Sequence, residues 1–349
     1  MSLHPITDVA GLHRHLEAAI QLEHATIPPY LTALYSIRPG TNSAACQVLR
    51  AVAVEEMLHL TLSANILNAV GGTPDLTVPG FVPRFPAYLP DGETDFRVDL
   101  RRFSKAAMET FLKIERPAPA AADTARTVTR PPKPGMLKAG KVADDGAEHF
   151  YSIGEFYHAI EDGLIRLEAE HGPELFTGDP ARQVTPEFYY SGGGEIIAVT
   201  DLASARAAIR LIAEQGEGDG GAIFDYEDEI AHYYRFQQLV LGRYYREGDV
   251  AGSPSGLAVD VDWDAVYPVK TNARVADYPE GSELRRAAEA FNAEYAGFLA
   301  LLTRAFRGEP ALLNDAMGGM FRLKDLAGQL MRQPLDAAGT EHAAPTFEV

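Results

Sequence analysis

The sequence predicts an all-α protein built around a four-helix bundle, with long insertions between its helices and extra helices in its C-terminal part. Three observations lead to this fold class. Apolar residues recur at helical spacing along four long segments, a short turn joins the first two, and polar residues interrupt the apolar stripes at matching levels. Helices of this kind pack side by side around a shared interior.

The first helix is expected at 8–37, with Thr7 and Asp8 as candidates for its N-terminal cap. Its apolar stripe contains one carboxylate, Glu23. The Pro28-Pro29 pair predicts a bend just after that residue, since proline removes a backbone hydrogen bond from a helix.

The second helix is expected at 43–70 and ends at a Gly-Gly-Thr-Pro sequence that terminates helices well. Because the turn before it is short, it should be antiparallel to the first helix. Its inner stripe is apolar except for Glu56, His59 and Ser63. Burying Glu56 and His59 costs several kcal/mol (about 2–7 for an unpaired polar group) unless something pairs with them.

The remaining elements complete the bundle and extend it. Further helices are expected at 104–114, 148–171, 201–215, 222–246, 282–306 and 309–332, with a small β-hairpin within 187–199. We divide the chain into a bundle over 1–246, interrupted by insertions at 72–147 and 173–220, and a C-terminal helical region over 247–349 that packs on it.

The charge composition limits the kinds of molecule that the protein is expected to bind. The chain has 349 residues, with 31 Lys and Arg against 49 Asp and Glu, which gives a formal net charge of −18. Nucleic acids and anionic membranes select for basic faces, so neither is expected as a partner. A small-molecule substrate is expected instead, and a homodimer is compatible with a bundle of this size.

The cysteine content and the hydropathy point to a cytoplasmic setting. Cys46 is the single cysteine, which excludes an internal disulfide and a cysteine-based zinc cluster. The N-terminal residues do not have the pattern of a secretory signal, and no run of about 18 apolar residues is present. We therefore expect a reduced, cytoplasmic environment.

The motif Glu-x-x-His occurs twice, as Glu56 to His59 and as Glu229 to His232. On a helix, residues three apart lie on one face, so the carboxylate and the imidazole can reach one metal ion. Two such helices, with one Glu from each of two others, form the di-metal carboxylate site of ferritin-like bundles. The alternative is a buried hydrogen-bonded network of these four residues without metal.

The other two carboxylates should come from the first and third helices. Glu23 and Glu56 each lie about 14 residues from the turn between their helices, so they meet at one level of an antiparallel pair. In the third helix, Glu161 shares a face with Tyr157, whereas Glu155 lies off the main apolar stripe. These arguments leave the choice between Glu155 and Glu161 open.

The charges of this site balance with two divalent ions, since four glutamates carry four negative charges that would otherwise repel. Iron is expected, with manganese and zinc as alternatives, because carboxylates and imidazoles suit all three. The candidate ligands are Glu23, Glu56, His59, Glu155, Glu161, Glu229 and His232. Three neighbours, Tyr30, Tyr157 and Glu55, are candidates for contacting the ligands rather than the metal.

Several of these motifs together resemble a known family. The runs EHATIPPY from Glu23, EEMLH from Glu55, NILNAVGG from Asn65 and IGEFY from Ile153 are similar to the ferritin-like domain family of iminophenyl-pyruvate dimer synthase. The resemblance covers about residues 10–240, and enzymes of violacein and rebeccamycin assembly carry this domain. In that family the IGEFY run marks the third helix, which favours Glu155 as the ligand.

The resemblance implies a di-iron oxidoreductase of secondary metabolism, using O₂ or peroxide on a small amino- or imino-acid-like substrate. The pathway synthases are much larger chains, so the fold and the metal site are implied more directly than the dimerising reaction. Two alternatives come from other classes: a ferroxidase or iron-storage protein, and a bundle with a purely structural metal.

Overall fold

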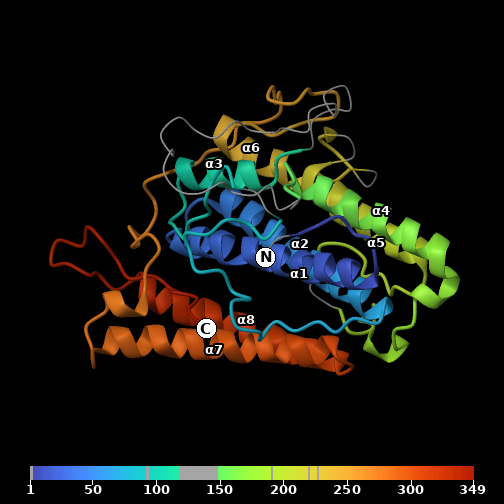
Figure 1. Cartoon of the computed structure of the whole chain (residues 1–349). Coiled ribbons are helices and arrows are strands. Elements are labelled where there is room, and N and C mark those ends of the chain that lie inside the picture. The colour runs from blue at the N-terminus through green and yellow to red at the C-terminus, as the bar shows by residue number, and fades with distance from the viewer. Residues whose placement is uncertain (1–2, 92–93, 118–147, 190–191, 219–220, 226–227) are drawn as a thin grey trace, which may run out of the picture.

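In a computed structural model of the chain, two central helices lie between two groups of surrounding helices (Figure 1). The structure describes residues 3–91, 94–117, 148–189, 192–218, 221–225 and 228–349. Helices α1 and α2 run through the middle of the molecule. Helices α3, α4, α5 and α6 lie on one side of this pair, and α7 and α8 lie on the other.

Helix α1 spans Val9–Ser36, as the sequence predicted. Asp8 caps its N-terminus, because the carboxylate accepts a hydrogen bond of 2.6 Å from the backbone N–H of Gly11. The helix continues through Pro28 and Pro29, and the hydroxyl of Thr32 donates to the carbonyl of Pro28 at 2.7 Å.

Helix α2 spans Ser43–Ala69 and is antiparallel to α1, also as predicted. Residues 58–69 are all buried, so α2 is covered on every face over its second half. A helix surrounded in this way contacts both groups of helices. It can therefore present ligands to one side and apolar side chains to the other.

The helices on the first side begin at polar caps. Helix α3 spans Lys105–Ile114 after the cap Ser104, in agreement with the prediction. Helix α4 spans Ile153–His171 and begins later than expected, because Ser152 caps it and accepts a hydrogen bond from Glu155 N–H. Helix α5 spans Leu202–Glu217.

Two expectations in this half were wrong. Helix α6 spans only His232–Leu241, far shorter than the predicted 222–246. In the segment before it, Ala231 N–H donates to the carbonyl of Ile223, and Asp225 N–H donates to the carbonyl of Glu229. These bonds across a turn replace the helical hydrogen bonds that the prediction required. The hairpin expected within 187–199 is absent from the described part of that segment, which contains no strand. Gly193 and Gly194 instead have positive φ values and let the backbone approach α2 closely.

The C-terminal part forms a pair of helices, α7 over Glu283–Phe306 and α8 over Leu313–Met331, which packs against α1 and α2. Short 3₁₀ turns occur at Gly172–Leu175, Pro180–Arg182, Val275–Asp277 and Pro310–Leu312. Among the described helices, none is long and apolar enough to cross a membrane.

Candidate metal centre

Five buried side chains from four helical elements meet on one side of the α1–α2 pair. They are Glu23 of α1, Glu56 and His59 of α2, Glu115 at the C-terminal cap of α3, and His232 at the first position of α6. Each is at most 2% exposed. This arrangement brings together residues that are more than 200 positions apart in the chain.

The five side chains form two overlapping groups of donors. In one group, an atom each of Glu23, Glu56 and His59 lie within 4.8 Å of one another, and in the other the same holds for Glu56, Glu115 and His232. Glu56 belongs to both groups. A carboxylate has two oxygens, so this one side chain can serve two cations at once.

The ring of His232 is held by a carboxylate on its far side. Its Nε2 lies 2.7 Å from Oε2 of Glu55, and Arg235 donates to Oε1 of the same carboxylate at 2.8 Å. Nδ1 of His232 faces Oε1 of Glu56 at 3.1 Å and Oε2 of Glu115 at 3.5 Å. When Nε2 carries the proton and donates it to Glu55, Nδ1 has a free lone pair that points towards the centre of the cluster.

The ring of His59 is oriented in the same way by an amide. Gln215 donates from its NH₂ group to the carbonyl of Gly193 at 2.7 Å, which turns its oxygen towards Nε2 of His59 at 2.9 Å. Nε2 therefore carries the proton, and Nδ1 faces Glu23 at 3.6 Å. The two imidazoles lie 5.5 Å apart, centre to centre.

Each of the three carboxylates also accepts a hydrogen bond from a hydroxyl group. Tyr157 donates to Glu23, Tyr30 donates to Glu115, and Thr26 donates to Glu56 at 2.8 Å. Tyr30, Tyr157 and Glu55, which the sequence suggested as neighbours of the ligands, thus all contact the cluster. Gln215 and Thr26 were not anticipated.

Ionised carboxylates without a cation beside them are electrostatically unfavourable in this cluster. Burial, with the nearby charges of Glu115 and Glu23, raises the pKa of Glu56 to about 8. Burial alone would lower the pKa of His232, but its contacts with Glu115, Glu55 and Glu56 outweigh this and raise the pKa well above its usual value. Without a cation, protons must therefore hold the cluster together.

The residues present suit a metal. Nδ1 of His232 is buried and makes no hydrogen bond, although two carboxylate oxygens face it. A lone pair buried among carboxylates is unfavourable unless a cation lies between them. Three carboxylates and two imidazoles form a donor set that divalent transition metals bind readily.

Glu229, predicted as a ligand, does not lie in this cluster. Helix α6 begins only at His232, so the i, i+3 geometry that would align Glu229 with the histidine does not exist. The side chain of Glu229 is 52% exposed and lies 3.3 Å from Arg235. The second Glu-x-x-His motif therefore contributes its histidine alone.

The two candidates on the third helix also lie outside the cluster. Glu155 is in the first turn of α4, and its carboxylate turns back to accept a hydrogen bond of 2.8 Å from the backbone N–H of Tyr151. Glu161 faces α5 and pairs with Arg206 at 2.6 Å. On α4, the side chain that reaches the cluster is Tyr157.

Glu115 is the carboxylate that sequence reasoning missed. It follows helix α3, within the connection between α2 and α4, and lies one turn beyond the buried Phe111. A carboxylate at the end of the buried stripe of Ala107, Met108 and Phe111 is the same kind of signal that identified Glu56. The long connection around it has the composition of an insertion, which hides this signal in the sequence.

The chain has the features of a helical carboxylate protein. Its buried carboxylates and histidines come from an antiparallel pair of helices and from the helices around that pair. A model of the ferritin-like family matches residues 16–241. The chain belongs to the ferritin-like family, which confirms the family that its motifs resembled.

Two individual proteins illustrate the relationship. The dichlorochromopyrrolate synthase of Lentzea aerocolonigenes is 28% identical over 336 residues, which covers 86% of this chain but 29% of that protein. This chain thus spans less than a third of the length of that relative. The crystal structure of a ferritin-like protein from Caulobacter vibrioides has the same fold, with a TM-score of 0.58 at 23% identity over 94% of this chain and 96% of that one.

Proposed function

We propose that the chain is a di-metal oxidoreductase whose ions, most simply iron, are held by Glu23, Glu56, His59, Glu115 and His232. The observation that carries this proposal is the membership of Glu56 in both donor groups. One ion would be held by Glu23 and His59 and the other by Glu115 and His232, with Glu56 shared. Manganese and zinc remain alternatives, since the same donors bind them.

Redox-active ions held there would supply the binding and reduction of O₂ or peroxide. The protein side chains would do the remaining work. Glu55 and Gln215 hold the two imidazoles in the tautomer that exposes Nδ1. Tyr157 and Tyr30 each hold a proton against a carboxylate oxygen, which fixes the orientation of Glu23 and Glu115.

The substrate class is part of the proposal and rests on the motifs that resemble the family of iminophenyl-pyruvate dimer synthase. The Lentzea aerocolonigenes protein is named as a synthase. We infer that this chain oxidises a small organic molecule of the amino- or imino-acid class. Because the chain corresponds to only part of that relative, the coupling of two such molecules is not included in the proposal.

Metal analysis of protein purified from iron-fed cells tests the proposal. We expect two metal ions per chain in the wild-type protein and a loss of both in Glu56→Ala. Glu161→Ala is the control, because this carboxylate pairs with Arg206 away from the cluster. Well under one metal per chain, with no loss in Glu56→Ala, would overturn it.

The oxidoreductase activity needs a second readout. Uptake of O₂ by the metal-loaded protein should increase when an aromatic amino or imino acid is added and should disappear in Glu56→Ala. Two metals per chain without substrate-dependent uptake would leave a structural or iron-handling role instead. A 12- or 24-subunit assembly in size-exclusion chromatography would favour iron storage.

A further inference from the structure

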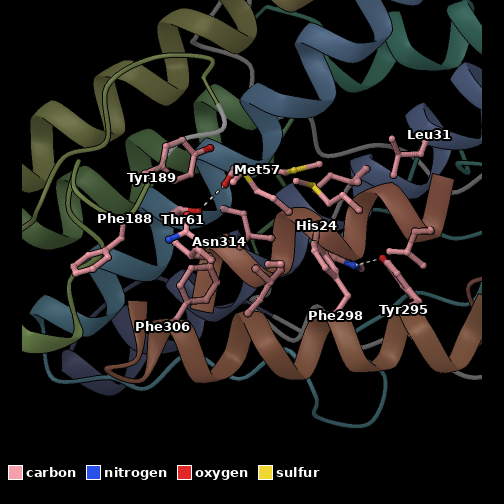
Figure 2. Close-up of a pocket in the computed structure, with 18 of the residues that line it drawn as sticks. His24, Leu31, Met57, Thr61, Phe188, Tyr189, Tyr295, Phe298, Phe306 and Asn314 are labelled. Carbon is pink, nitrogen blue, oxygen red and sulfur yellow. Dashed lines mark hydrogen bonds between the residues drawn. The ribbon is translucent and has the colours of Figure 1, made fainter. Parts of the chain in front are cut away.

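A second feature of the α1–α2 pair is a cavity on the side away from the carboxylate cluster. It lies between this pair and helices α7 and α8, and it measures about 100 Å³ (Figure 2). His24 and Met57 line it and directly follow the cluster residues Glu23 and Glu56 in sequence. The two sites thus share the same two helices but use different faces of them.

The wall of the cavity is mostly apolar and aromatic, and Thr61 and Asn314 add polar groups to it. Aromatic side chains come from three parts of the chain: Tyr35 from α1, Phe188 from the segment before α5, and Phe298 from α7. Among the described residues that line the cavity, none is Asp, Glu, Lys or Arg. Burial lowers the pKa of His24 to about 3, so this residue is neutral as well.

Two polar side chains in this wall, His24 and Tyr295, are joined by a hydrogen bond. Nε2 of His24 lies 2.5 Å from the hydroxyl oxygen of Tyr295, and both residues are buried. A phenol hydroxyl has one donor and two acceptor sites. Whichever of the two atoms donates here, the hydroxyl of Tyr295 retains the capacity for one more hydrogen bond.

Three methionines, Met57, Met317 and Met320, complete the lining. Their thioethers are flexible and make favourable contacts with aromatic rings, so they adapt to a flat apolar guest. A void left empty forfeits the dispersion contacts of the side chains around it. In another protein, an engineered apolar cavity of roughly 150 Å³ holds benzene, so the smaller cavity here limits the guest to a single ring.

We propose that this cavity is a binding site for a neutral, single-ring aromatic molecule that carries one hydrogen-bonding group. Size, the aromatic and methionine lining and the hydrogen-bonded pair of His24 and Tyr295 select this class. A free carboxylate is disfavoured, because no cation in the wall would compensate its desolvation. The site is therefore distinct from one for a free amino acid, and its occupation requires no metal.

Calorimetric titration of the full chain with three probes tests the proposal. Toluene, 4-methylphenol and 4-methylbenzoate have similar shapes and differ in polarity and charge. We expect saturable binding of toluene and 4-methylphenol, with 4-methylbenzoate at least tenfold weaker. Absence of saturable binding, or binding of all three with equal affinity, would contradict the proposal.

Substitutions locate the site. Ala316 is buried in the cavity wall, so Ala316→Leu should weaken binding of 4-methylphenol at least tenfold, whereas Ala300→Leu on the exposed face of α7 should not. Met317→Trp fills the same space at a half-buried position and replaces Ala316→Leu if that variant does not fold. Unchanged binding in the folded cavity variant would place the probes elsewhere.

The polar pair has its own control. Tyr295→Phe keeps the ring and removes the hydroxyl, so it should weaken 4-methylphenol several-fold and leave toluene unchanged. Equal effects on both probes would exclude the hydroxyl as the polar contact. Because the probes need no metal in order to bind, their failure would not affect the proposed oxidoreductase function.

Discussion

Glu56 is the side chain whose burial is electrostatically most costly to the metal site. It lies in an apolar stripe, is 2% exposed, and faces Glu23 and Glu115. A carboxylate in that position is stable only when it is protonated or when a cation is beside it. The raised pKa of Glu56 and the unbonded Nδ1 of His232 are two consequences of the same concentration of buried carboxylates.

Metal affinity should therefore depend on pH. Because the pKa of Glu56 is raised to about 8, this side chain holds a proton at pH 6 to 7, which a metal must displace. The apparent affinity for Fe(II) should fall as the pH decreases from 8 to 6, by about tenfold per pH unit for each proton displaced. Anaerobic titrations at several pH values measure this slope, and a flat profile would contradict it.

Glu55 should control the metal at His232 without binding it. The substitution Glu55→Gln weakens the contact that fixes the ring and the tautomer of His232 and removes one of the two carboxylates that pair with Arg235. We expect metal affinity to decrease about 10- to 100-fold, as for other residues that orient metal-binding histidines. Glu161→Gln is the matched control, and equal affinities in the two variants would argue against this role.

At the level of elements, helical periodicity predicted most of the helices well and α6 poorly. Helices α1 and α2 agree with their predicted ranges because buried stripes over seven turns leave little ambiguity. Helix α6 is shorter than predicted because the Glu-x-x-His spacing favours a helix through Glu229, which the turn before His232 prevents. Four of the five clustered residues could thus be named from sequence, although one rested on an incorrect helix.

The remaining part of the site depends on tertiary structure that a local pattern does not encode. Glu115 and His232 lie at helix ends, where α3 and α6 pack against each other. At the end of a helix, periodicity gives little information on where a side chain points. The same limit applies to Gln215, whose orientation is set by the carbonyl of Gly193.

Packing at the end of α2 gives a prediction at the element scale. Gly178 donates its N–H to the carbonyl of Ala69, and a Cβ there would lie 1.7 Å from the carbonyl oxygen of Asn68. Gly178→Ala should therefore lower the free energy of unfolding by about 1–3 kcal/mol or more. Urea denaturation followed by circular dichroism measures the change.

Gly297 is the matched control for that substitution. It lies inside α7, is exposed, and has no neighbouring atom within 4 Å of the position that a Cβ would occupy. Gly297→Ala should raise the free energy of unfolding by about 0.5–1 kcal/mol, because alanine has the higher helix propensity. If both variants change stability in the same direction, the close approach at Gly178 is not the cause.

On the scale of the whole molecule, the α1–α2 pair separates two environments. Its first face meets α3, α4, α5 and α6 around buried carboxylates, and its second face meets α7 and α8 around an uncharged cavity (Figure 1). The net charge of −18 therefore includes a small interior part, the carboxylates of Glu23, Glu56 and Glu115, which two divalent ions would more than balance.

The central claim is that two metal ions share Glu56. Anomalous scattering from a crystal of the metal-loaded protein, recorded at the iron and manganese edges, tests it most directly. We predict two peaks, one beside Glu23 and His59 and the other beside Glu115 and His232, with Glu56 between them. A single peak, no peak, or peaks bound by Glu155, Glu161 or Glu229 would contradict this arrangement.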